Sequence, residues 1–447
     1  MYPRVSTTNS RWSRRSVLGG LALAALPAPA FAANVGVDLA PAGGDQTAAF
    51  QAGLDRATAE KRPFVLGPGT YRIGAIRLPD GAQITGVAGL TTLTAADGGL
   101  AISGGPAKRI VLSGLGIDGR ERAAAGAEAL VHLIGVEELR VADCLIGRGT
   151  ASGLLLDRCG GRVERNAIAA CGAIGVFARD SRRLTIADNS VTDCGDGGIL
   201  VHRAQAGDDG TIVSRNRVER IAARSGGTGQ VGNGINTFRA GGVAIVENRI
   251  SDCALSGIRV NGGGNLRIVG NEVTRSGETA LYVEFEFTGA VVASNVIDTA
   301  AMGISVVNFM QGGRLAVVSG NLVRNITRPP PYPAEVPGMG FGITVEADAT
   351  ITGNVVESVT QAGILVGWDR YLRDVAVTGN VVRGAPIGLF VSVDGAAGPA
   401  ILADNLISGA KTAIQGQRHG EPVGGDMLAS GAQSFPHLTL SGNRAAK

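Results

Sequence analysis

The stretch that decides the fold is residues 248–273, which read NRISDCALSGIRVNGGGNLRIVGNEV. Asn248 is followed by Asn271 at an interval of 23 residues, and a β-branched residue stands two positions after each. Between them lies Gly257-Ile-Arg-Val. Alternation of apolar and polar residues with a period of two is typical of short strands with one buried face. Three such strands, with turns between them, fit into one unit of this length.

The same unit recurs along most of the chain. Its first position is occupied by Asn166, Asn189, Asn216, Asn248, Asn271, Asn295, Asn321, Asn354, Asn380 and Asn405. Each of these residues has an aliphatic residue three positions earlier and a β-branched residue two positions later. One coil of three strands cannot bury its inner face alone, so the coils must stack. The repeat therefore predicts parallel sheets wound into a β-helix.

We interpret the Asn column as structural. Stacked side-chain amides can hydrogen-bond from coil to coil, and Asn tolerates the left-handed backbone of a tight bend. Cys171, Cys194 and Cys253 all stand five residues after their Asn, so we expect them to be buried thiols.

Composition excludes several classes of protein. The chain has 447 residues, of which 69 are Gly and 45% are hydrophobic, and its net charge is only +3. The glycines follow no collagen period, and the apolar content is too high for disorder. Five cysteines are too few for a disulfide scaffold. Scattered arginines and a small net charge give no reason to expect a nucleic-acid partner.

Residues 1–32 are predicted to be a twin-arginine export signal. Arg14 and Arg15 precede an apolar run over 17–26, and Ala30-Phe-Ala32 is a small-residue cleavage pattern. This run is too short to cross a membrane, which takes about 20 residues. The segment holds four of the 41 basic residues and no acidic one, so cleavage changes the net charge from +3 to −1. We expect a monomeric periplasmic or secreted protein with no membrane span, exported by the twin-arginine machinery.

The region after the signal carries a resemblance to a known superfamily. Gly44-Asp-Gln-Thr-Ala-Ala-Phe50, Gly69-Thr-Tyr71 and Leu78-Pro-Asp-Gly81 stand in this order ahead of the repeats. Together with the repeats, this resembles the right-handed parallel β-helix of the pectate-lyase superfamily, and also an uncharacterised family of twin-arginine-translocated repeat proteins. The resemblance implies an amphipathic helix that caps the first coil.

We place this capping helix at 45–62, with Asp45 as N-cap and Phe50, Leu54 and Ala57 on one face. The predicted fold is all-β: one domain over 33–445, a single-stranded right-handed parallel β-helix with about a dozen coils and three sheets.

Two insertions break the period at the same turn, just before the Gly-Ile-x-Val strand. They occupy residues 217–233 and 326–341. We expect these loops to wall a groove whose floor is formed by outward-facing residues of the Gly-Ile-x-Val strands. The resemblance implies the same location, because the corresponding sheet forms the substrate groove in pectate-lyase-like proteins.

The strands between the insertions carry the candidate site. We predict Arg259, Tyr282 and Glu284 as catalytic. Arg259 would bind a carboxylate, and either Tyr282, its pKa lowered by the arginine, or His202 would act as base or acid. The predicted substrate-binding residues are Asn236, Phe238, Asn261, Glu346 and His202. A plain alternative is that solvent-facing strands are polar anyway and that Arg259 merely pairs with Glu284.

These residues favour a carbohydrate-active protein that binds or modifies an acidic polysaccharide by lyase or epimerase chemistry. Two alternatives stay open. One is a non-catalytic glycan-binding or envelope scaffold protein, and the other is an inverting glycoside hydrolase that uses Glu284 and Glu346. The sequence lacks the Asp cluster of pectin hydrolases, the His/Asp motif of alginate epimerases and the paired-Asp calcium site of pectate lyases. No motif indicates a cofactor, and calcium is the candidate metal ion.

Overall fold

The computed structural model describes residues 36–122, 124–227, 229, 231–332 and 339–446. The predicted export signal lies outside these residues. Val37–Lys447 form one compact unit. No helix in the described ranges is long and apolar enough to span a membrane.

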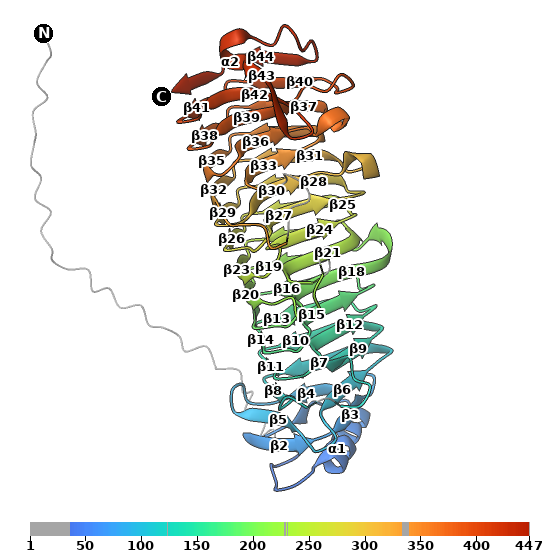
Figure 1. Ribbon diagram of the computed structural model, residues 1–447. Coiled ribbons are helices and arrows are strands. Elements are labelled where there is room, and N and C mark those ends of the chain that lie inside the picture. The colour runs from blue at the N-terminus through green and yellow to red at the C-terminus, as the bar shows by residue number, and fades with distance from the viewer. Residues whose placement is uncertain (1–35, 123, 228, 230, 333–338, 447) are drawn as a thin grey trace, which may run out of the picture. The chain divides into compact units, whose positions relative to one another are not determined.

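Three sheets of 15 strands each run through this unit, and the chain visits them in turn (Figure 1). Strands pair in parallel, except that β43 closes the last sheet antiparallel to β42. The result is a right-handed β-solenoid of about 14 turns, which confirms the predicted fold class. The sequence predicted about a dozen turns. The additional turns precede Asn166, where the Asn column does not mark the coils.

The strands of the first sheet are β1 (Phe64–Val65), β4 (Gln83–Thr85), β7 (Ala107–Ser113), β10 (Val136–Ala142), β13 (Gly161–Glu164), β16 (Leu184–Ala187), β19 (Ile212–Ser214), β22 (Ala244–Val246), β25 (Gly264–Val269), β28 (Thr288–Ala293), β31 (Arg314–Ser319), β34 (Ala347–Thr352), β37 (Arg373–Thr378), β40 (Ala400–Ala403) and β44 (Leu438–Ser441).

The strands of the second sheet are β2 (Gly69–Ile73), β5 (Thr91–Ala95), β8 (Gly116–Asp118), β11 (Leu145–Gly147), β14 (Ala167–Ala169), β17 (Ser190–Thr192), β20 (Arg217–Ile221), β23 (Arg249–Cys253), β26 (Glu272–Thr274), β29 (Val296–Asp298), β32 (Leu322–Ile326), β35 (Val355–Val359), β38 (Val381–Arg383), β41 (Leu406–Ser408) and β45 (Arg444–Ala446).

The strands of the third sheet are β3 (Ala75–Leu78), β6 (Ala101–Gly104), β9 (Ala129–Ile134), β12 (Ser152–Asp157), β15 (Ile174–Arg179), β18 (Gly197–Asp208), β21 (Asn233–Gly241), β24 (Ile258–Asn261), β27 (Thr279–Glu284), β30 (Met302–Val306), β33 (Phe341–Val345), β36 (Ala362–Val366), β39 (Ile387–Ser392), β42 (Thr412–Arg418) and β43 (Glu421–Asp426). This sheet contains the Gly-Ile-x-Val strands.

The Asn column forms a continuous ladder at the turn between the first and second sheets. From Asn166 to Asn405, each side-chain Nδ2 donates to Oδ1 of the Asn in the next coil at 2.8–3.0 Å, and Asn443 ends the series. The structural interpretation is therefore confirmed. One detail was wrong: the left-handed residue is the one before the Asn, for example Asp188 (φ 59°) and Arg215 (φ 52°).

The first coil is covered by helix α1 (Thr47–Ala59), which buries Phe50, Leu54 and Ala57 as predicted. The ring of Phe50 packs edge-on against Phe64 of β1, with 5.1 Å between centroids. Asp45 does not occupy the N-cap position itself, but its Oδ1 accepts from the Thr47 amide at 2.8 Å. Apolar contacts of this kind close an interior that the coils alone would leave open.

Three short helical segments interrupt the coils later in the chain. They are η1 (Phe309–Gln311), η2 (Asp369–Tyr371) and α2 (Met427–Ser430). Segments η1 and η2 lie in turns between the third and first sheets, next to the site described below.

Both insertions lie between the second and third sheets, in agreement with the period break. The sequence placed the first at 217–233, but residues 217–221 form β20, which pairs with β17 and β23. This loop is therefore 222–232. The second loop runs from 327 to 340, between β32 and β33.

Candidate functional site

The register of the third sheet brings the predicted residues side by side. Asn236 pairs with Arg259, and Arg259 with Tyr282. Two positions further along the strands, Phe238, Asn261 and Glu284 form a second row of the same kind. Because stacked strands are about 4.8 Å apart, residues of one row contact each other directly.

Arg259 is the centre of a buried ion cluster. Its Nε donates to Oε1 of Glu284 at 2.6 Å, and its Nη1 lies 3.7 Å from Oε2 of Glu278. Asn261 Nδ2 also donates to Oε1 of Glu284, at 3.1 Å. Only 7% of Arg259 and 1% of Glu284 are exposed. Two carboxylates thus share one guanidinium, which leaves the cluster with one excess negative charge.

The inserted loops cover this cluster, whereas the sequence had predicted walls on either side of an open floor. Asn236 Nδ2 donates to the Gly229 carbonyl of the first loop at 3.0 Å. From the second loop, the Tyr332 hydroxyl donates to Glu278 Oε1 at 2.6 Å. Polar strand residues that would face water in a regular coil are therefore buried beneath the loops. Glu278 was missed because it stands in a turn that carries no periodic signal.

Tyr282 differs in its chemistry from the prediction. Arg259 Cζ lies 4.9 Å from the centroid of its ring. Nevertheless, burial and the negative charge of Glu284 raise the pKa of the Tyr282 phenol above its ordinary value. The expectation of a lowered pKa was wrong, because these two effects outweigh the arginine. Tyr282 is therefore a protonated hydrogen-bond donor at neutral pH.

His202 lies in an aromatic cluster at the other end of the row. Its ring centroid is 5.2 Å from that of Phe177 and 5.8 Å from that of Phe238. Asn236 directs its Nδ2 to the first loop, so its Oδ1, 3.1 Å from His202 Nε2, accepts a hydrogen bond from the ring N–H. Burial lowers the pKa of His202 to about 4, so the ring is neutral at physiological pH.

An open hollow of about 440 Å³ lies next to the cluster, on its C-terminal side. Its floor continues the first row, since Tyr282 pairs with Ser305, Ser305 with Thr344 and Thr344 with Leu365. The remaining lining residues come mainly from the turns that hold η1 and η2, and they include Asn308, Met310, Glu346, Trp368 and Tyr371.

Glu346 is the titratable acid of this hollow. Its Oε2 accepts from the Phe309 amide at 2.5 Å. Burial raises the pKa of the Glu346 carboxyl above its ordinary value, although backbone hydrogen bonds oppose the shift. A half-buried acid with a raised pKa beside an open hollow is suited to proton transfer.

The structure thus divides the predicted residues into two groups. Arg259, Glu284 and Asn236 are buried, and Asn261, Phe238 and His202 lie beside them at intermediate exposure, whereas Tyr282 and Glu346 line the hollow. Within the described part of the chain, no three His, Cys, Asp or Glu side chains are placed to hold one metal ion.

Three parallel sheets wound into a right-handed solenoid, with a hollow on the third sheet, place the chain in the class of parallel β-helix proteins. The family model of the right-handed β-helix region matches residues 81–218 and 205–382, which is more than half of the chain. The chain belongs to this family. Among curated proteins, none matches it.

Solved structures with a similar course of the chain include enzymes and an adhesin. The mannuronan C-5 epimerase AlgE6 A-module of Azotobacter vinelandii is 15% identical, with a TM-score of 0.45 over 90% of this chain and 96% of that one. A PL6 alginate lyase in complex with a trisaccharide is 14% identical, with a TM-score of 0.47 over 88% and 93%. PfbA, a surface adhesin of Streptococcus pneumoniae, is 12% identical, with a TM-score of 0.45 over 84% and 89%. Similarities at this level do not assign an activity.

Proposed function

We propose that the protein binds a polysaccharide chain across the third sheet, with one sugar in the hollow beside Tyr282. The observation that carries the proposal is the lining of the hollow. Trp368 and Tyr371 supply aromatic surface, while Ser305, Thr344 and other polar groups supply hydrogen bonds. Its volume of about 440 Å³ is in the range of small-molecule sites, which combine apolar walls with a few placed polar groups.

Glu346 is the residue we propose for proton transfer in this hollow. An acid that keeps its proton to higher pH can donate it to a leaving oxygen. The inverting-hydrolase alternative requires a second carboxylate, for which the sequence suggested Glu284. That group already accepts from Arg259 and Asn261 and is almost fully buried, so it is not free to activate a water molecule.

Lyase or epimerase chemistry on an acidic sugar is the second candidate, and one observation favours it. Among the described residues, Nη1 of Arg259 is buried and has no hydrogen-bond partner, so one donor of the guanidinium is left unused. The net charge of the site opposes binding of an acidic sugar, because the two acids Glu278 and Glu284 outnumber the one base, Arg259. Above its pKa, Glu346 adds a further negative charge. We therefore propose an uncharged sugar for the hollow.

The experiment is a binding and turnover screen of neutral and acidic polysaccharides with matched variants. Trp368→Ala is expected to weaken binding by about tenfold, since it removes the largest aromatic surface of the hollow. Leu406→Ala, on the exposed face of the second sheet, should leave the affinity unchanged. Equal binding by both variants would refute the proposed site.

Turnover is measured in the same screen by new reducing ends and by ultraviolet absorbance of unsaturated products. If the wild type forms new reducing ends and Glu346→Gln does not, the result would support hydrolysis with Glu346 as the acid. Unsaturated products from an acidic polymer would support the lyase alternative. Binding without either product would establish a glycan-binding protein.

We also propose that the protein acts in the periplasm or outside the cell after twin-arginine export. This proposal rests on the motif in residues 1–32. Replacing Arg14 and Arg15 by Lys should trap the uncleaved chain in the cytoplasm, and an exported variant would contradict it.

A further inference from the structure

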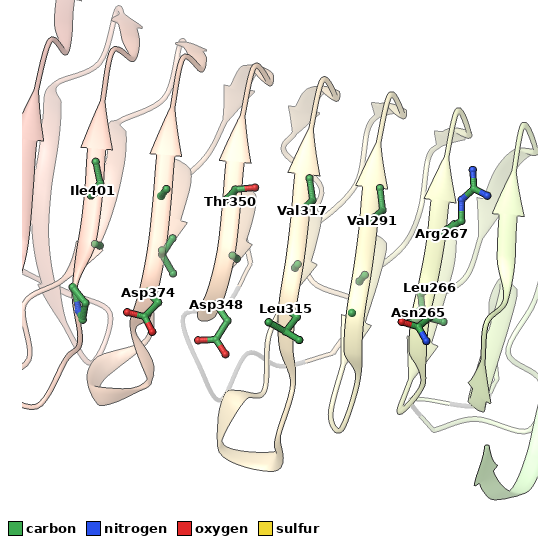
Figure 2. Close-up of a pocket in the computed structure, with 18 residues that line it drawn as sticks. Asn265, Leu266, Arg267, Val291, Leu315, Val317, Asp348, Thr350, Asp374 and Ile401 are labelled. Carbon is green, nitrogen blue, oxygen red and sulfur yellow. The ribbon is translucent and has the colours of Figure 1, made fainter. Parts of the chain in front are cut away.

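The first sheet carries an exposed apolar strip that the proposed function does not use (Figure 2). It extends over β25, β28, β31, β34, β37 and β40 and borders a shallow hollow of about 840 Å³. Its outward row begins at Arg267 and continues in register through Val291, Val317, Thr350, Ala376 and Ile401. The three aliphatic side chains Val291, Val317 and Ile401 are 39–47% exposed.

One residue on the edge of this strip is unusual. Leu315 has a left-handed backbone, with φ of 65°, and its side chain is 49% exposed. The edge positions on either side of it in Figure 2 include Asn265, Asp348 and Asp374, which are residue types that tolerate this conformation. Leu315 is therefore strained and also presents a large apolar side chain to solvent, near the middle of the strip.

The charges at the strip are complementary and separated along it. Arg267 on β25 and Asp374 at the start of β37 are both exposed, and neither forms an ion pair within the described residues. Asp348 is different, because Arg373 binds it through Nε at 2.8 Å. Arg267 thus lies toward one end of the strip and the free acid Asp374 toward the other, while Arg314 and Arg373 stand at the starts of β31 and β37.

We propose that this strip is the contact surface between two copies of the chain. In a symmetric dimer, the same patch must complement itself. A two-fold axis parallel to the strands, between β31 and β34, stacks β25 of one copy over β40 of the other. It brings Arg267 near Asp374 of the second copy at both ends, and it places the two Leu315 side chains near the centre. This arrangement differs from the monomer expected from the sequence.

The size of the strip sets the expected affinity of the dimer. Six strands about 4.8 Å apart and about six residues long give a patch of about 24 by 20 Å, so the dimer buries about 1,000 Å² in total. This is the lower limit for a specific interface. We therefore expect a reversible dimer with a Kd of about 10 μM.

Sedimentation equilibrium of the purified chain over a range of concentrations tests the proposal. The wild type should shift from one to two chain masses as concentration rises, and Val317→Lys should weaken association by at least about tenfold. Ile212→Lys is the matched control, because Ile212 is 43% exposed on the same face but lies outside the strip. It should dimerise like the wild type. A wild type that stays monomeric at about ten times the expected Kd would overturn the proposal.

A charge exchange tests the arrangement. Arg267→Asp and Asp374→Arg should each weaken the dimer, and the double variant should restore it, because the complementary pair is reformed with its signs exchanged. A double variant weaker than both single variants would overturn the arrangement about this two-fold axis. If the wild type is monomeric but binds the apolar dye anilinonaphthalene sulfonate, and Val317→Lys does not, the strip holds an apolar ligand and the dimer is refuted.

Discussion

Asn271→Ala tests whether the amide ladder holds the coils together. Nδ2 of Asn271 donates to the Ile245 carbonyl at 2.9 Å and to Asn295 Oδ1 at 3.0 Å, and its Oδ1 accepts from both the backbone amide and Nδ2 of Asn248 at 3.0 Å. The substitution removes four hydrogen bonds at a position that is 1% exposed. At about 1 kcal/mol each, the expected loss in free energy of unfolding is about 4 kcal/mol.

Urea unfolding, followed by the fluorescence of Trp368, measures this loss. Each coil of a solenoid is stabilised mainly by its neighbours, so hydrogen exchange should also accelerate most in the coils that contain β22 to β29. The control is Asn325→Gly, because Asn325 is an exposed left-handed residue with one amide contact, to Asp298. A loss below about 1 kcal/mol for Asn271→Ala would refute the energetic role of the ladder.

Arg259→Ala is expected to cost about 3–5 kcal/mol of unfolding free energy, because it leaves Glu278 and Glu284 buried without their shared cation; urea denaturation checks this, and Arg259→Met combined with Glu278→Gln and Glu284→Leu should recover most of the loss. Glu346→Gln should flatten the dependence of stability on pH. Since the pKa of Glu346 is raised on folding, the unfolded chain releases this proton first, and wild-type stability should fall as pH rises above the ordinary glutamate pKa. A pH series of melting temperatures measures the difference, and identical profiles would contradict the shift. Arg275→Asp should cost about 1 kcal/mol and less at high salt, because it places two acids in neighbouring coils where Arg275 now binds Asp252 at 2.6 Å.

The repeating part of the fold was predictable because its signals are periodic. Stacking in register places residues one repeat apart, most often 23–27 positions, in the same column. One offset from Asn166 or Asn189 therefore identifies the same position in each coil. Burial of Cys171, Cys194 and Cys253 followed from this frame. The handedness came from the resemblance, which added what spacing alone does not determine.

The site was only partly predictable, because it depends on segments outside the period. The alternation showed which strand residues point outward, but it could not show that Gly229 and Tyr332 of the two insertions bind Asn236 and Glu278 there. A signal for the hollow was present: Val366 and Val375 are nine positions apart, whereas Val260 and Leu266 are six. The surplus residues form η2, which brings Trp368 to the lining of the hollow.

Burial changes how the Arg259 cluster must be tested for function. The residue that the sequence indicated for catalysis holds two buried acids in place, so loss of activity in Arg259→Ala would not distinguish chemistry from misfolding. Tyr282 and Glu346 can be separated from that problem, because they line the hollow and their hydrogen-bonding groups can be altered without uncovering a buried charge. If Tyr282→Phe and Glu346→Gln are at least as stable as the wild type near neutral pH but lose turnover, the chemistry lies in the hollow. If both retain turnover, the reaction does not depend on the hydroxyl of Tyr282 or the carboxyl of Glu346, and the proposed role of Glu346 as the acid is wrong.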